Sequence, residues 1–282
     1  RFSYPSTEDA YLVIDGYTDM SEIKIDPAKR QISGWVNNQR FVNDSKSFRN
    51  YFVVQFDKPF EDYGVWENQK DEVFPQKLDG AGKGYGAFIK FKKGSKVQAK
   101  AASSYISAEQ ALITLNKELG KDKNLEVTKA RGQKTWNEVL NRIVVEGCTD
   151  EQMKTFYSCL FRANLFSRKF YERKENGEPY YYSPYNGKIY DGYMYTDNGF
   201  WDTFRSQFPL TNILHPTMQG RYMNALLAAQ EQCGWLPSWS SPGETGGMLG
   251  NHSISLLADA WAKGIRDFDP EKALKAYAHE AM

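Results

Sequence analysis

The alternation of apolar and polar residues predicts antiparallel strands over the first hundred positions. Residues 11–15, 22–26 and 31–36 alternate with a period of two and are rich in β-branched and aromatic side chains. Asp26-Pro27-Ala28-Lys29 supplies the proline of a tight turn, so the second and third segments are expected to form a hairpin. The apolar positions expected to face one core are Ile23, Ile25, Ile32 and Val36.

Further strands are predicted at residues 51–57, 86–92 and 96–105, the last two joined by Lys93-Gly94. The polar, glycine-rich span 67–84 is expected to be a long exposed loop. The apolar runs alternate, and no helical pattern separates them. An antiparallel sandwich therefore fits better than a parallel sheet with crossover helices.

From Ser107 onward the apolar residues recur with the period of a helix. Ser107 and Thr149 each begin a capping-box pattern, and an apolar stripe after Ser107 runs to Gly120. A second helix is predicted at about 133–142. These segments are expected to link the sandwich to the C-terminal half of the chain.

The remaining third of the chain predicts helices separated by loops of unusual composition. A tyrosine-rich stretch, 180–195, is expected to approach a binding site. Helices are predicted near 201–214, 216–233 and 252–263, and another begins at Pro270 with Asp269 as its N-cap. Antiparallel helices joined in this way are the pattern of an (α/α) toroid. The predicted fold is thus mixed and multi-domain: a partial antiparallel β-sandwich (1–106), a helical linker (107–148) and the first part of an α/α toroid (149–282).

Composition excludes some classes of partner. Lys and Arg number 36 against 35 Asp and Glu, and a net charge of +1 favours neither nucleic acid nor an anionic membrane surface. No apolar run approaches the roughly 20 residues of a membrane span. Three cysteines without a Cys-x-x-Cys pair predict buried free thiols rather than a disulfide framework or a zinc site. The chain opens without Met and stops within a helical pattern, so we expect an internal segment of a longer protein.

Candidate chemistry is concentrated in residues 199–264, where tryptophans, glycines, a carboxylate and an imidazole occupy the loops between helices. Such a mixture favours a sugar as ligand, because the C–H face of a pyranose stacks on an indole while its hydroxyls bind charged and amide groups. The candidate substrate-binding residues are Trp201, Asp202, Arg205, Trp235, Glu244 and His252.

Each candidate also has a structural alternative. Asp202 either contacts a ligand or compensates a helix dipole, and it lies three residues before Arg205, close enough for the two to pair. The tryptophans serve equally well in core packing. Glu244 fits an exposed loop as well as a site, and His252 fits a helix N-terminus at which Asn251 is the capping residue.

Several runs of sequence resemble one known family. They are WDTFR (201–205), EQCGWLPSW (231–239), ETGGMLGNH (244–252), LADAWAKGI (257–265) and, earlier, SYISAEQALITLNKE (104–118). Together they resemble, in order and over most of the chain, the calcium-dependent exo-acting α-mannosidases of glycoside hydrolase family 92.

The resemblance implies an inverting mannosidase that removes terminal α-mannose from a mannose-containing glycan, in a periplasmic or secreted location. It also implies that Asp202 binds hydroxyls of that mannose and that Ca²⁺ binds the sugar, with ligands that the sequence does not identify. The family's acid and base lie in HGNEPSHH-like and GNDDCG-like motifs, and neither string occurs here. We therefore expect no catalytic residue within this segment, and no turnover by it alone.

Two other classes of function remain open from the residues themselves. A non-catalytic carbohydrate-binding protein would use the same aromatic and polar side chains. A glycosidase or lyase for another sugar could be built on the same toroid.

Overall fold

The computed structural model describes residues 1–16, 19–37, 48–68, 70 and 72–281. Contacts between Cα atoms divide the chain into two compact units. Within the described residues, the first unit runs to Arg131 and the second begins at Gly132. The domain boundaries expected from the sequence, at 106 and 148, stay a prediction.

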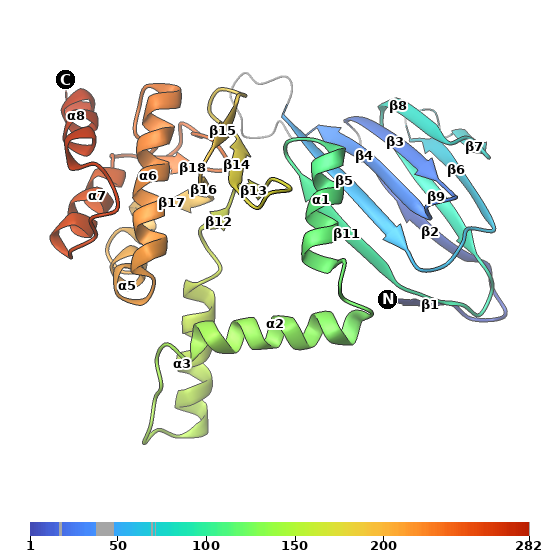
Figure 1. Ribbon diagram of the computed structural model, residues 1–282, viewed down its shortest axis with the longest axis horizontal. Helices are drawn as coiled ribbons and strands as arrows, with labels where there is room; N and C mark the ends of the chain where they lie inside the picture. Colours follow the sequence, from blue (N-terminus) through green and yellow to red (C-terminus); the bar gives the residue numbers. More distant parts are fainter. Residues whose placement is uncertain (17–18, 38–47, 69, 71, 282) are drawn as a thin grey trace. The chain divides into compact units, whose positions relative to one another are not determined.

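Two antiparallel sheets form the first unit (Figure 1). The five-stranded sheet has the order β11 (Ala99–Ser104), β5 (Arg49–Phe56), β4 (Gln31–Asn37), β3 (Met20–Asp26) and β8 (Asp79–Lys83). The four-stranded sheet has the order β2 (Ala10–Ile14), β9 (Tyr85–Phe91), β6 (Asp62–Glu67) and β7 (Glu72–Pro75). A short pair, β1 (Phe2–Ser3) with β10 (Lys96–Val97), adds to them.

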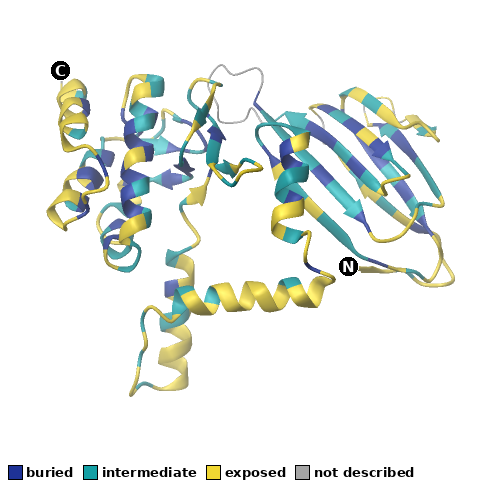
Figure 2. Cartoon of the chain, viewed as in Figure 1, coloured by how far each residue is buried: buried dark blue, intermediate teal, exposed yellow. Residues whose placement is uncertain are grey.

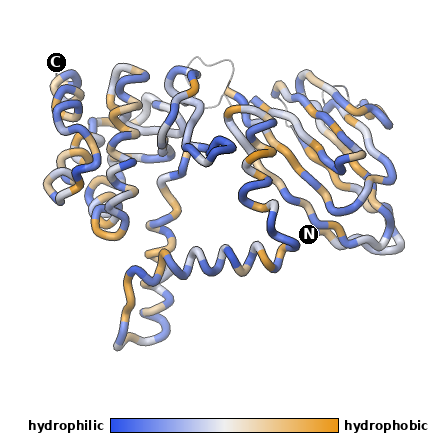
Figure 3. Tube along the Cα trace, in the orientation of Figure 1, coloured by the Kyte–Doolittle hydropathy of each residue, from blue (hydrophilic) through white to orange (hydrophobic). Residues whose placement is uncertain are grey.

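The apolar faces of the two sheets meet in one core, so the predicted sandwich is confirmed. The predicted hairpin is β3–β4, with Ile25 opposite Ile32. Figure 3 shows hydrophobic residues recurring along these strands. The buried core residues come from both sheets: Ala10, Ile23, Ile25, Ile32, Phe56, Val65, Ala87, Ile89, Phe91 and Val97. Val36, expected in the same core, is only half-buried.

The prediction of a loop over residues 67–84 is wrong, because β7 and β8 lie within it. Strand β8 pairs with β3 at the edge of the larger sheet despite two glycines. The ring of Tyr85 explains one of them: a Cβ on Gly80 would lie 2.3 Å from it. The predicted strands at 86–92 and 96–105 also do not pair with each other, since β9 joins β2 and β6 while β11 joins β5.

Helix α1 (Ala108–Leu119) packs on the outer face of the larger sheet. Its predicted N-cap is confirmed, because the Ser107 side chain accepts a hydrogen bond from the Gln110 N–H. Ala111 and Leu115 pack against Val53. Since neighbouring residues of a strand face opposite sides, Val53 points away from the core that Phe56 and Val54 line. The first unit therefore has three layers.

Helices α2 (Leu125–Leu140) and α3 (Asp150–Ala163) come next in the chain. The capping box predicted at Thr149 is present, with both of its hydrogen bonds. Helix α2 begins eight residues before the predicted start, and the Asn124 side chain caps it by accepting from the Val127 N–H. None of its residues is fully buried.

Three small sheets occupy the tyrosine-rich stretch and its surroundings. They are β12 (Arg168–Lys169) with β16 (Tyr195–Thr196); β13 (Glu172–Arg173), β14 (Pro179–Tyr182) and β15 (Ile189–Asp191); and β17 (Asn198–Gly199) with β18 (Trp239–Ser240).

The last helices are α4 (Phe200–Thr203), α5 (Gln207–Leu214), α6 (Pro216–Cys233), α7 (Ser253–Ala262) and α8 (Pro270–Ala281). The single helix expected over 201–214 is thus two helices. Helices α5 to α8 pack against one another, with α6 the most buried of them (Figure 2). Helix α6 ends at Gly234, whose φ of 90° suits glycine. Asp269 caps α8 as predicted, because its carboxylate accepts from the N–H groups of Glu271 and Lys272.

Cys148, Cys159 and Cys233 are free, as expected, but the expectation that they are buried is wrong: Cys159 is exposed and the other two are partly so. Among the described helices, none combines the length and apolar character that crossing a membrane requires.

Candidate functional site

The short β17–β18 ladder brings two loops of the second unit together. Asn198 pairs with Ser240 and Gly199 with Trp239, so the start of α4 lies beside the loop after α6. Buried hydrogen bonds hold this ladder. The Asn198 amide bonds with the hydroxyls of Ser167 and Tyr222, and it is almost fully buried. The β17–β18 ladder, on which the neighbouring loops are built, is therefore a fixed part of the fold.

Asp202 and Trp239 line one cavity of about 390 Å³ beside this ladder. Gly199 lies between them. A Cβ on Gly199 would be 2.7 Å from the indole ring of Trp239 and 2.8 Å from Oδ2 of Asp202. Only a residue without a side chain lets the carboxylate and the ring approach the backbone this closely. The result is an acceptor beside an apolar ring face.

Trp235 and Glu244 line a second cavity, of about 440 Å³, in the same unit. Trp235 is 55% exposed, and its ring centroid lies 4.8 Å from that of His279. Tyr185 and Glu280 also line this cavity.

The carboxylate of Glu244 is held by its own loop. Oε2 accepts hydrogen bonds from the backbone N–H groups of Ser238 and Trp239, and Oε1 accepts from the Ser238 hydroxyl and the Gly246 N–H. These four bonds match the roughly four acceptor positions of a carboxylate. Glu244 thus shapes the loop that carries the two tryptophans.

Glu280 is a second carboxylate that fixes this loop, and the sequence reasoning missed it. Oε1 accepts from the Leu236 N–H at 2.6 Å, and Oε2 accepts from the Asn251 side chain at 2.8 Å. It lies in α8, 44 residues from Leu236, so no local pattern relates the two. Trp239, which lines the cavity with Asp202, is not among the six candidate residues, although it shares a loop position with Trp201 and Trp235 in the sequence.

Burial dominates the electrostatics of the second cavity. It raises the pKa of the Tyr185 phenol well above its usual range, although the hydrogen bond with the Ser240 hydroxyl, at 3.1 Å, opposes that effect. Burial also raises the pKa of the Cys233 thiol. Both groups therefore stay protonated at neutral pH and act as neutral parts of the wall.

His252 and Arg205 gather around a third residue, Phe204. The imidazole stacks on the Phe204 ring with centroids 4.4 Å apart, and the Arg205 guanidinium lies 5.0 Å from the centre of that ring. His252 is the N-cap of α7, but its side chain makes no capping bond. In the described chain, no ion pair joins Arg205 to Asp202, because α4 ends at Thr203 and Arg205 lies beyond it.

The structure therefore brings the predicted site residues together only in part. Asp202 lines one cavity, while Trp235 and Glu244 line another. His252 and Arg205 contact the ring of Phe204, two residues after Asp202, but line neither cavity. Trp201 is 53% exposed and lines neither cavity. That these side chains grip one sugar stays a prediction.

Among residues 1–16, 19–37, 48–68, 70 and 72–281, no three His, Cys, Asp or Glu side chains gather as a metal site would require. Three of the four carboxylates that line the two cavities are already engaged: Glu244 and Glu280 by backbone and side-chain donors, and Asp197 by Arg168 at 2.7 Å, which leaves Asp202 as a single carboxylate. The described side chains do not fit a Ca²⁺ cage.

Comparison with known proteins covers nearly the whole chain. The profile of the glycosyl hydrolase family 92 N-terminal domain matches residues 1–104, and that of the family's catalytic domain matches residues 110–282. No curated protein sequence matches the chain.

Two solved structures from Bacteroides thetaiotaomicron are similar. The family GH92 inverting mannosidase BT2199 is 44% identical, with a TM-score of 0.93 over 99% of this chain and 37% of that one. The family GH92 α-mannosidase BT3965, in complex with mannoimidazole, is 23% identical, with a TM-score of 0.87 over 100% of this chain and 38% of that one. At that identity the second likeness shows the fold alone. The chain spans less than two fifths of either.

Proposed function

The chain belongs to glycoside hydrolase family 92, and on that premise we propose that the protein containing it is an exo-acting, inverting α-mannosidase. It removes terminal α-mannose from glycans, and this chain supplies part of the wall that holds the sugar. The observation that carries the proposal is the cavity in which Asp202 and Trp239 flank Gly199. That pair of groups suits the two kinds of surface that a hexose presents.

Asp202 is suited to bind sugar hydroxyls. It lies at the start of α4, is exposed, and forms no ion pair within the described residues, so its oxygens are available as acceptors. Hydrogen bonds to a carboxylate are stronger than those between neutral groups. The Trp239 ring beside it offers an apolar face for the C–H groups of a pyranose. Together they orient the sugar as well as bind it.

Inversion requires two carboxyl groups about 6.5–9.5 Å apart, one to protonate the leaving oxygen and one to activate water. We assign neither role within this chain, because Glu244 and Glu280 have their oxygens occupied by the loop and Asp202 alone cannot supply the pair of carboxyl groups. We propose that the acid and base come from parts of the protein outside these 282 residues. This chain then binds and orients mannose but does not by itself cleave the glycosidic bond.

The family resemblance also implies a calcium requirement. The described side chains hold no cluster that fits the ion, so we assign it no ligand here and derive no step through it. We propose that chelation abolishes mannoside hydrolysis by the full-length protein and that added calcium restores it.

The test is hydrolysis of an aryl α-mannoside by the full-length protein and by its Asp202→Asn variant. We expect kcat/KM to fall by about 100-fold in the variant, because an uncharged amide binds the hydroxyls less tightly in ground and transition states. Asp191→Asn is the matched control, since Asp191 lies on strand β15 and pairs with Lys174 at the surface. Equal kinetics in Asp202→Asn and the wild type would overturn the assignment of Asp202.

Further outcomes separate the other classes of function. Mannose binding without release of the aglycone by the full-length protein would indicate a carbohydrate-binding protein rather than an enzyme. Faster cleavage of another aryl glycoside would indicate a different sugar. The isolated 282-residue chain should release no aglycone, and turnover at ordinary glycosidase rates would place an acid and base within it.

A further inference from the structure

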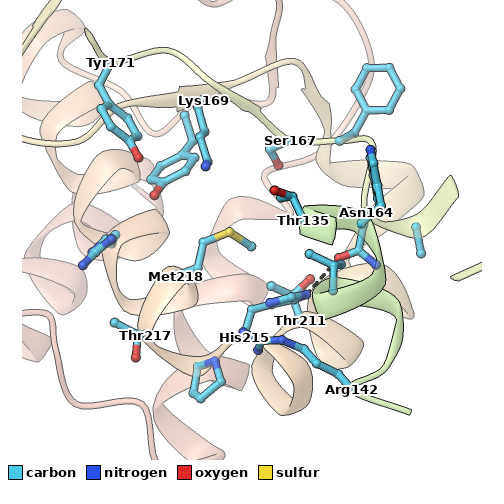
Figure 4. Close-up of a pocket in the computed structure, with 17 residues that line it drawn as sticks. Thr135, Arg142, Asn164, Ser167, Lys169, Tyr171, Thr211, His215, Thr217 and Met218 are labelled. Carbon is cyan, nitrogen blue, oxygen red and sulfur yellow. Dashed lines mark hydrogen bonds between the residues drawn. The ribbon is translucent and has the colours of Figure 1, made fainter. Parts of the chain in front are cut away.

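The second unit contains a larger cavity that none of the predicted site residues lines. Its volume is about 580 Å³, within the range of about 300–1,000 Å³ that is usual for small-molecule sites. Its walls come from the C-terminal part of α2, from residues 163–171, and from the first turns of α6 (Figure 4). We call it the basic cavity because its charged lining residues are cations.

Three cations line the basic cavity, Arg142, Lys169 and Arg221, and none of its lining residues is Asp or Glu. Within the described chain, none of the three forms an ion pair with a carboxylate. Arg142 donates to the carbonyl of Leu214, and Arg221 lies 4.3 Å from the centre of the Tyr193 ring. These contacts position the cations without neutralising them.

The cation next to Lys169 in the sequence does form an ion pair. Arg168, next to Lys169 on strand β12, pairs with Asp197 at 2.7 Å, outside the basic cavity. The positive charge also acts on His215, whose pKa is lowered by burial and then by Arg142. A cavity with several uncompensated cations lowers the free energy of a bound anion.

The remaining walls suit a sugar rather than a bare ion. Tyr171 and Tyr195 line the cavity with their rings 5.8 Å apart, and Trp136 lines it from α2. In Figure 4, Lys169 and Tyr171 lie on one side of the cavity, and His215 and Arg142 lie on the other. Aromatic faces next to cations and hydroxyls match a pyranose that carries a negative group.

The basic cavity adjoins the cavity of Asp202, because Phe166 lines both. Phe166 is 59% exposed, and its carbonyl accepts a hydrogen bond from Gln207, as does that of Ala163. The backbone at Phe166, the residue that lines both cavities, is thus held by hydrogen bonds. A glycan with one unit beside Asp202 would place a neighbouring unit in the basic cavity by passing Phe166.

We propose that the basic cavity binds a negatively charged sugar, one bearing a phosphate, sulfate or carboxylate group. Lys169 and Arg221 contact the anionic group, and the aromatic walls contact the ring. The claim that this sugar is a further unit of the substrate glycan rests on the proposed mannosidase function. The claim that the cavity prefers negatively charged sugars does not depend on that function.

The test is calorimetric titration of the full-length protein with mannose 6-phosphate and with mannose. We expect the Lys169→Gln variant to bind mannose 6-phosphate about tenfold more weakly, the loss of one charge-assisted contact, while its affinity for mannose is unchanged. Lys154→Gln is the matched control, since Lys154 is an exposed residue of α3 outside the cavity. Glucuronate and inorganic phosphate, titrated in the same way, distinguish a carboxylate sugar from a phosphate sugar and from a bare anion.

The Asp202→Asn variant separates this proposal from the proposed function. It should lose affinity for mannose and keep its affinity for mannose 6-phosphate. Equal affinity of the wild type for the charged and neutral sugars would overturn the proposal. The proposal would also be overturned if Lys169→Gln and Lys154→Gln bound mannose 6-phosphate equally well. The same holds if inorganic phosphate bound the wild type as tightly as mannose 6-phosphate does. Absence of mannoside hydrolysis would overturn only the proposed function, because none of these titrations depends on turnover.

Discussion

Glu244 binds Ser238 at two points: its Oε2 accepts the backbone N–H at 2.7 Å and its Oε1 accepts the hydroxyl at 2.9 Å. The same carboxylate accepts from the N–H groups of Trp239, at 3.3 Å, and Gly246, at 2.9 Å. Its acceptor capacity is used within the loop. The charge that the sequence analysis assigned to a ligand therefore stabilises the segment that presents Trp235 and Trp239.

Replacing Glu244 with Gln should loosen this loop. The amide nitrogen would face N–H and O–H donors, leaving part-buried donors unpaired, so we expect the free energy of unfolding to fall by about 1–3 kcal/mol. Urea denaturation measures it. Glu231→Gln on α6 is the control, because Glu231 is exposed and pairs only with Lys272 at the surface, where the loss should stay below about 1 kcal/mol. Equal losses in the two variants would contradict the role of Glu244.

Leu115 is a buried contact between α1 and the larger sheet. It is 1% exposed and packs with Ala111 against Val53. Leu115→Ala should destabilise the first unit by about 2–5 kcal/mol, because it leaves a cavity in a closed interface. Leu125→Ala, at a position 44% exposed, should change stability by less than about 0.5 kcal/mol. Thermal unfolding of the two variants compares them, and similar melting temperatures would mean that α1 is not part of this core.

Elements specified by neighbouring residues were predicted well from the sequence. The hydroxyls of Ser107 and Thr149 act within three residues, and both helix starts are as expected. The hairpin β3–β4 results from alternation and a turn, which are equally local. Pro216 and Gly234 bracket α6 for the same reason.

Features that depend on distant residues were not predicted. The glycines of β8 suggested a loop, but Gly80 is required by the ring of Tyr85 on another strand. Glu280 holds Leu236 across 44 residues, and no period in the sequence relates them. The grouping of site residues also depends on distant residues. Asp202 and Glu244 line different cavities, and the place where their two loops meet is set by the β17–β18 ladder, which neither loop specifies alone.

His215 should make stability depend on pH. Its Nε2 lies 2.8 Å from the oxygen of Asn164, whose amide nitrogen donates to the Leu160 carbonyl, so the ring nitrogen is the donor. Burial and, after it, the charge of Arg142 lower the pKa of His215 in the folded state.

The unfolded chain takes up this proton near pH 6.5, and the folded chain only at lower pH. In that interval the unfolded state binds more protons, so the stabilisation present above about pH 6.5 is lost as the pH falls toward the folded pKa. Urea titrations at pH 7 and pH 5 should show a smaller loss of stability for His215→Gln than for the wild type. Identical losses would show that another group causes the pH dependence.

Gly199→Ala tests whether Asp202 and Trp239 act together on the sugar. The backbone tolerates alanine at the φ of −92° found there, but the new Cβ would lie 2.7 Å from the indole and 2.8 Å from the carboxylate. Both obstructing atoms are outer ends of side chains, so the ring and the carboxylate would move while the fold remains. If the proposed function holds, we expect KM for an aryl α-mannoside to rise about tenfold, the equivalent of one weakened charge-assisted contact.

Gly132→Ala is the control for that variant, because a Cβ on Gly132 meets nothing within 4 Å and the residue lies inside helix α2. It should raise stability by about 0.5–1 kcal/mol and leave KM unchanged. The contrast depends on geometry alone, since both variants add one methyl group to a glycine. If KM responds equally to the two, the approach of Asp202 and Trp239 around Gly199 has no part in binding the sugar, and the proposed site must lie elsewhere in the second unit.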